Sequence, residues 1–147
     1  MAAIETVGLE REFKGGLKAV GGVDISIAPG EVYGFLGPNG AGKTTTVRML
    51  VTLLRPTGGE ARVAGHDVAR EPDAVRRRIG VALQDAALDL LMTGRELMEL
   101  QAKLHGFAPR DVRPRADALI DRVGLVEAQD RRVGTYSGGM RRRLDLA

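Results

Sequence analysis

The stretch Gly37-Pro38-Asn39-Gly40-Ala41-Gly42-Lys43-Thr44-Thr45 decides the fold of this chain. It fits the pattern G-x-x-x-x-G-K-[ST] of a phosphate-binding P-loop. Glycines at this spacing let the backbone turn its N–H groups onto phosphate oxygens, and the helix that follows adds partial positive charge at the same place. We predict that Lys43 offers its ammonium to the β- and γ-phosphates. The Thr44 hydroxyl is suited to complete the shell of a magnesium ion.

The sequence on either side of this loop has the expected context, a strand before it and a helix after it. Residues 31–36 form a short, mostly apolar run after the turn at Pro29-Gly30, which predicts a buried strand. From Thr44 onward, apolar residues recur at helical spacing until Pro56 ends the pattern. These apolar residues are Val47, Leu50, Val51 and Leu54. The context favours a nucleotide site over a chance glycine-rich turn.

Length and composition limit the remaining possibilities. The 147 residues are enough for one domain, and the absence of cysteine excludes disulfides and thiolate metal sites. The N-terminus has no signal-peptide pattern, and no apolar run reaches the roughly 18 residues of a membrane span, so we expect a cytosolic chain. The formal net charge is +3, and the basic triplets at 76–78 and 141–143 have no interleaved aromatic residues. We interpret them as solvated helix faces and expect no nucleic-acid partner.

Two further strands are predicted ahead of the loop, at residues 4–9 and 17–27, with a hairpin signal at Gly15-Gly16 between them. Strands in this position suggest an antiparallel sheet laid beside a nucleotide core. Phe13 follows the first strand region. It is a candidate platform for stacking an adenine ring, and an ordinary core residue is the alternative.

Beyond the loop helix, short strands are predicted at residues 60–63 and 79–83, the second of which ends at Gln84. The carboxyl ends of strands are where α/β sheets bind ligands, so Gln84 is a further candidate site residue. His66 and His105 have no neighbouring ligand partners in the sequence. We interpret both as surface residues.

Residues 86–136 predict a helical lobe. Thr93-x-x-Glu96 is a capping box that starts one helix, whose apolar stripe continues to Gly106. A second helix is predicted at residues 112–123, with Pro114 in its first turn. After this lobe, Ser137-Gly138-Gly139 precedes a helical segment. Its pattern is that of an N-cap followed by bare N–H groups, which is either a plain helix cap or a second anion site.

Taken together, these motifs resemble those of the ATP-binding subunits of ABC transporters. The resemblance rests on Phe13, residues 37–45, Gln84 and Tyr136-Ser137-Gly138-Gly139-Met140, which follow the family's order. The phrases at 34–46 and 91–97 are most similar to the exporter branch related to daunorubicin resistance. Tyr136 and Met140 stand where the signature of the family usually has Leu and Gln, and Met140 has no amide with which to replace the polar role of that Gln.

The resemblance implies an α/β fold of the P-loop NTPase class and ABC type, with an N-terminal antiparallel β subdomain and a helical lobe. It implies a single domain over 1–147, divided into a β subdomain with the P-loop core at 1–85, the helical lobe at 86–136 and the start of the signature helix at 137–147. The implied cofactors are ATP and magnesium. The implied ATP contacts are Phe13, Gly37, Asn39, Gly40, Ala41, Gly42, Lys43, Thr44 and Thr45, with Thr44 and Gln84 at the metal and Gln84 also near the attacking water.

The resemblance also implies partners. Ser137, Gly138 and Gly139 would close over the ATP of a second subunit, and the dimer would drive membrane permease subunits that export a drug-like or other small substrate. Such a subunit is cytoplasmic and peripheral on the membrane through the permease. Two alternatives stay open: a non-catalytic nucleotide-binding or interaction module, and a soluble ABC-class ATPase that acts on nucleic acid or ribosomes.

The family pattern continues with a strand that ends in Asp-Glu and later with a histidine, and neither occurs in these 147 residues. We therefore expect a truncated domain without the C-terminal part of the core sheet and without the general base. Asp145 does not take that role, because it lies in the predicted signature helix. The expectation is weak nucleotide binding without steady hydrolysis.

Overall fold

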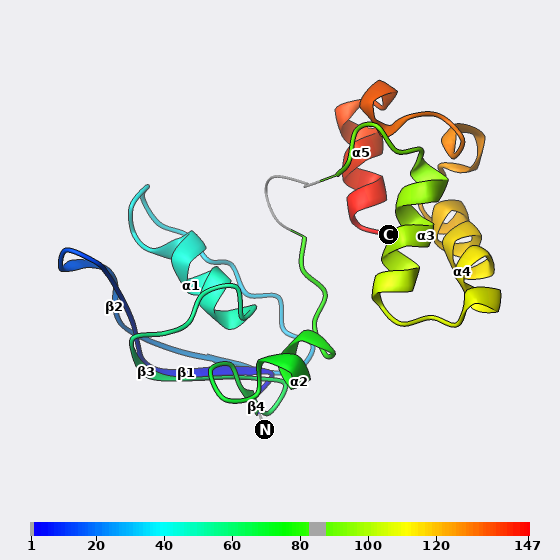
Figure 1. Ribbon diagram of the computed structural model, residues 1–147. Helices are drawn as coiled ribbons and strands as arrows, with labels where there is room; N and C mark the ends of the chain where they lie inside the picture. The colour runs from blue at the N-terminus through cyan, green and yellow to red at the C-terminus, as the bar shows by residue number, and fades with distance from the viewer. Residues whose placement is uncertain (1, 83–87) are drawn as a thin grey trace. The chain divides into compact units, whose positions relative to one another are not determined.

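The computed structural model describes residues 2–82 and 88–147 of the chain (Figure 1). The chain divides into two compact units, Met1–Val81 and Ala82–Ala147, each with its own hydrophobic core. Gln84, the candidate at the end of a predicted strand, lies outside the described residues.

The first unit is built on a four-stranded antiparallel sheet with the order β2-β1-β3-β4. Its strands are β1 (Ile4–Phe13), β2 (Leu17–Ile27), β3 (Gly58–Val63) and β4 (His66–Asp67). The register of the first hairpin runs from Ile4 opposite Ile27 to Phe13 opposite Leu17. The hairpin therefore closes at Gly15 and Gly16, whose positive φ angles of 93° and 80° suit glycine. The prediction of an antiparallel sheet ahead of the P-loop is confirmed.

Helix α1 (Lys43–Leu50) packs on this sheet through Met49, which is fully buried in one cluster with Leu9 of β1. Helix α2 (Pro72–Arg76) adds Val75 to the same cluster. The predicted buried face of α1 is wrong at Val47, which is 39% exposed. Successive residues of a helix are about 100° apart around its axis, so Val47 and Met49 lie on nearly opposite sides of α1. Met49 faces the sheet, and Val47 therefore points away from it.

Two predicted strands are also wrong for this structure. Residues 31–36 form neither strand nor helix, and Val32 and Leu36 are 98% and 93% exposed. Residues 79–82 are likewise not a strand, and Leu83 lies outside the described residues. A strand exists only through its ladder to a neighbour, and a parallel strand is normally buried on both faces. No strand in the described part of the chain pairs with either segment.

The second unit is helical. Its elements are α3 (Gly94–Leu104), α4 (Pro109–Arg122), η1 (Val126–Ala128), η2 (Val133–Thr135) and α5 (Gly138–Asp145). Leu97 of α3, Ile120 of α4 and Leu144 of α5 meet in one buried cluster. Among residues 2–82 and 88–147, no helix combines the length and the apolarity that a membrane crossing requires.

Helix α4 begins earlier than its sequence predicts. It starts at Pro109, so Pro114 lies inside the helix and not in its first turn. Proline removes the hydrogen bond to the carbonyl four residues earlier, here that of Arg110. Both residues are exposed, so water can solvate this carbonyl and the helix tolerates the loss.

The predicted capping box at the start of α3 is confirmed. The Thr93 N–H donates to Glu96 Oε2 at 2.8 Å, and the Glu96 N–H donates to Thr93 Oγ1 at 3.2 Å. The hydrogen bond from the Thr93 backbone, followed by that from its hydroxyl, holds the pKa of Glu96 below its ordinary value of 4.5.

This shift predicts how acid affects the helical unit. A lowered carboxyl pKa stabilises the fold above the unfolded-state pKa, and that stabilisation disappears as the pH falls through the folded-state pKa. Between about pH 5 and about pH 3, thermal unfolding of Glu96→Gln should therefore depend on pH less steeply than that of the wild type. Melting curves followed by circular dichroism check this. Equal slopes for the two proteins would contradict the role of the ionised carboxylate.

Candidate nucleotide-binding site

The P-loop connects to α1 at Gly42, which is the N-cap of the helix and has φ 80° and ψ 5°. This left-handed conformation favours glycine. A Cβ built at Gly42 would also overlap the Ala19 carbonyl oxygen of β2. The loop therefore lies directly against the sheet, which fixes where α1 begins.

The N-terminus of α1 presents unpaired backbone donors. No side chain caps the helix. The first backbone hydrogen bond of the helix runs from the Thr46 N–H to the Gly42 carbonyl at 2.8 Å. The N–H groups of Lys43, Thr44 and Thr45 have no acceptor among the described residues. Three free amides at the positive end of a helix dipole form a binding site for an anion such as phosphate.

Lys43 is held by its own loop. Its Nζ donates to the Gly37 carbonyl at 2.7 Å and to the Pro38 carbonyl at 2.6 Å. These neutral acceptors keep the ammonium at the mouth of the loop. A phosphate oxygen is a stronger, charged acceptor, so an arriving phosphate would draw Nζ away from the two carbonyls.

The other predicted loop residues are accessible. Asn39, Gly40, Ala41 and Thr44 are exposed, and Thr45 is half-buried. The Thr44 hydroxyl has no hydrogen-bond partner among the described residues, so it is available as an oxygen ligand. A hydroxyl beside free amides and an ammonium is a donor set that fits a magnesium-bound phosphate.

Phe13 lies at the hairpin end of β1 and is 37% exposed. The Arg11 guanidinium covers one face of its ring at 4.8 Å from the ring centroid. Phe13 pairs with Leu17 at the start of β2, and Ala19 two residues later lies under Gly42. The start of β2 thus connects Phe13 to the P-loop, and a stacking adenine would need the ring face opposite Arg11.

The second candidate anion site is the start of α5. Ser137 is the N-cap residue, and its Oγ accepts from the Met140 N–H at 3.2 Å. Ser137, Gly138 and Gly139 are exposed, and the amides of the two glycines have no acceptor among residues 2–82 and 88–147. Met140 packs against the hydrophobic cluster of this unit.

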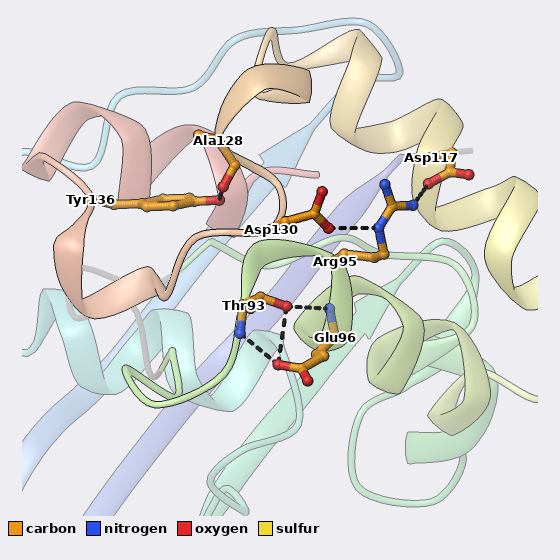
Figure 2. A network of polar contacts seen from close by, with 7 residues as sticks. All are labelled: Thr93, Arg95, Glu96, Asp117, Ala128, Asp130 and Tyr136. Atoms are coloured by element: carbon orange, nitrogen blue, oxygen red, sulfur yellow. Dashed lines mark hydrogen bonds and ion pairs between the residues drawn. The ribbon is translucent and has the colours of Figure 1, made fainter.

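The segment before α5 is held by backbone hydrogen bonds to residues at the start of α3 and just before it. The Arg95 N–H donates to the Gln129 carbonyl at 2.9 Å, and the Val133 N–H donates to the Met92 carbonyl at 2.9 Å. Figure 2 shows that Arg95 reinforces this contact by ion pairs with Asp117 and Asp130. Arg95 therefore joins α3, α4 and the chain that precedes the signature.

Sequence reasoning missed the ion pairs of Arg95, the hydrogen bond from the Tyr136 hydroxyl to the Ala128 carbonyl, and Gly94, where a Cβ would overlap that hydroxyl. Nothing local marks Gly94 or Arg95, because their partners lie more than twenty residues away. Tyr136 carried a signal, since it replaces the usual Leu of the signature, and a buried tyrosine requires an acceptor for its hydroxyl.

The structure thus places Phe13 and the P-loop in the first unit, at the two sides of the start of β2, and places Ser137, Gly138 and Gly139 in the second unit. Gln84 falls outside the described residues. The described parts of both units present exposed, unpaired amides at a helix start.

Comparisons with known proteins identify the family of this chain. A family model described as ABC transporter matches residues 20–147. The chain is 57% identical over 145 residues to the daunorubicin/doxorubicin resistance ATP-binding protein DrrA of Streptomyces peucetius, covering 99% of this chain and 44% of that protein. It is 49% identical over 134 residues to the doxorubicin resistance ATP-binding protein DrrA of Mycobacterium tuberculosis, covering 91% of this chain and 40% of that protein.

The fold resembles that of cbiO1 from Clostridium perfringens, part of the ABC transporter complex cbiONQ. The TM-score is 0.83 at 23% identity, over 99% of this chain and 59% of that chain. The chain spans less than half the length of the two DrrA proteins. The match of the family model over most of the chain, together with the identity to these relatives, shows that this chain belongs to the ABC transporter family.

Proposed function

We propose that this chain binds MgATP at its P-loop as the ATP-binding component of an ABC exporter for drug-like small molecules. The observation that carries the proposal is the start of α1, where three unpaired amides, the Lys43 ammonium and the free Thr44 hydroxyl lie together. The names of the two DrrA relatives support the class of substrate.

In this proposal each loop residue has a separate task. The amides of Lys43, Thr44 and Thr45 hold the phosphate oxygens at the helix N-terminus, and Lys43 Nζ leaves the Gly37 and Pro38 carbonyls for the β- and γ-phosphates. The Thr44 hydroxyl, together with Gln84, would hold the magnesium ion. Bound magnesium supplies positive charge against the phosphate oxygens. Phe13 would orient the nucleotide by stacking the adenine on the ring face opposite Arg11.

The Ser137–Gly139 segment acts on the nucleotide of a second subunit. The free amides of Gly138 and Gly139 suit the γ-phosphate, so ATP would join two subunits and its cleavage would release them. We propose that this movement reaches a membrane permease, at whose cytoplasmic face the subunits work. Hydrolysis is the ATPase activity of the whole subunit. The described P-loop residues bind and orient the triphosphate, and none of them is placed as the base that activates water.

A chimera tests the exporter function without depending on the length of the chain. The matched 145-residue stretch of the Streptomyces peucetius protein is replaced by that of this chain, and the chimera is expressed in a strain that lacks the parent protein. We expect daunorubicin resistance close to that given by the parent and no resistance from the chimera with Lys43→Ala. A chimera that binds MgATP but gives no resistance would overturn the proposed substrate class and leave the nucleotide site intact.

A further inference from the structure

Tyr136 immediately precedes Ser137, the N-cap of α5, and is only 2% exposed. Its hydroxyl donates to the Ala128 carbonyl at 2.7 Å, a bond that reaches from the signature back to η1 (Figure 2). Burial raises the pKa of this hydroxyl above its ordinary value of 10.0, so the donor proton is in place at physiological pH. The ring and its hydroxyl are both anchored.

Gly94 provides the space for that hydroxyl. A Cβ built at Gly94 would overlap Tyr136 Oη and would lie 3.3 Å from Cζ. Gly94 is the first residue of α3 and has no positive φ, so its backbone does not require glycine. The need for glycine here comes from the tyrosine, and the phenol sits at the start of α3 with its hydroxyl on η1.

Tyr136 lies two residues before the first residue of α5, and the backbone between them is held by hydrogen bonds. The Tyr136 N–H donates to the Val133 carbonyl at 3.0 Å, so the backbone before the ring is also bound. The next residue, Ser137, caps α5 through the Met140 N–H. Farther along α5, Arg143 donates to the Val123 carbonyl at 3.0 Å and holds the helix to the end of α4. Of these two side-chain contacts, that of Tyr136 with Ala128 lies nearer in sequence to the exposed Gly138 and Gly139 amides.

We propose that Tyr136 is a positioning residue that aims the Ser137 cap and the Gly138 and Gly139 amides by means of its hydroxyl. A leucine at this position would fill the apolar volume but would have no hydroxyl to donate to the Ala128 carbonyl. It would therefore not tie the residue before Ser137 to η1. That the aimed amides receive the phosphate of a partner subunit rests on the proposed function. The placement of the cap itself does not.

The first test measures amide hydrogen exchange in the 147-residue chain by NMR. In Tyr136→Phe, exchange of the Met140 and Arg141 amides should rise about tenfold, because the cap loses its fixed position. Exchange at Leu97 in α3 and at Ile120 in α4 should stay unchanged. Tyr33→Phe is the matched control, since it removes the only other tyrosine hydroxyl, which lies in the first unit.

The second test measures function with the same proteins. Tyr136→Phe should bind a fluorescent ATP analogue as tightly as the wild type, because the P-loop is unchanged. Its association in the presence of MgATP, followed by sedimentation, should need about tenfold more protein. An unchanged Met140 exchange rate, or a uniform rise throughout the second unit, would overturn the positioning role. A selective rise at Met140 with a wild type that does not associate supports the positioning role and refutes the proposed dimer.

Discussion

Lys43→Ala should weaken MgATP binding by about a hundredfold or more, because charge-assisted bonds from the ammonium to two phosphates are lost and nothing replaces them. In the wild type this ammonium is already at the loop, bonded to the Gly37 and Pro38 carbonyls. Titration of the chain with a fluorescent ATP analogue measures the affinity. Thermal stability should change little, since the two lost bonds join exposed groups.

Lys103→Ala is the control for this experiment. Lys103 is an exposed residue of α3 in the second unit, outside the P-loop. It removes the same charge from the chain, so any effect of net charge alone appears in both variants. Wild-type affinity in Lys43→Ala would show that the nucleotide does not bind at this loop.

Gly94→Ala should lower the free energy of unfolding of the helical unit by about 3 kcal/mol. The added Cβ would overlap Tyr136 Oη, so the phenol must move and the buried Ala128 carbonyl loses its donor. Both overpacking and an unsatisfied buried carbonyl are costly. Urea unfolding followed by circular dichroism measures the change.

The same substitution should cost less than about 1 kcal/mol when Tyr136 is already Phe. The hydroxyl is then gone, and the nearest ring atom, Cζ, lies 3.3 Å from the new Cβ. A double-mutant cycle of the two positions should therefore give a coupling energy of about 2 kcal/mol. Gly80→Ala is the control, because a Cβ at Gly80 meets no atom within 4 Å and Gly80 has no positive φ. Additive effects of Gly94→Ala and Tyr136→Phe would contradict the contact.

The features that the sequence predicted correctly are those that depend on a few neighbouring residues. The hairpin at Gly15-Gly16 needs only two positive φ angles, and the capping box needs only Thr93 and Glu96 three positions apart. The Ser137 cap is of the same kind. Helix starts and tight turns satisfy their hydrogen bonds locally, so their residues can be recognised without knowing the fold.

The features that sequence reasoning missed depend on residues far apart in the chain. Whether α1 buries Val47 or Met49 is decided by the sheet beneath it, and a strand at residues 31–36 requires a neighbour that the described chain does not provide. The helical spacing of apolar residues in α1 is compatible with burial of either Val47 or Met49, because the pattern does not say which side of the helix meets the core.

The sequence by itself therefore determined the P-loop, the antiparallel hairpin, the helix caps and membership in the family. The tertiary structure alone decided that Lys43 is held by its own loop carbonyls. It also decided that Phe13 of β1 pairs with Leu17 of β2, two residues before the Ala19 that lies against Gly42. It also decided that the Tyr136 hydroxyl occupies the space that a Cβ at position 94 would need. The physical reason is range: dihedral preferences and caps act within one turn of chain, whereas packing and buried hydrogen bonds join residues whose separation in sequence carries no signal.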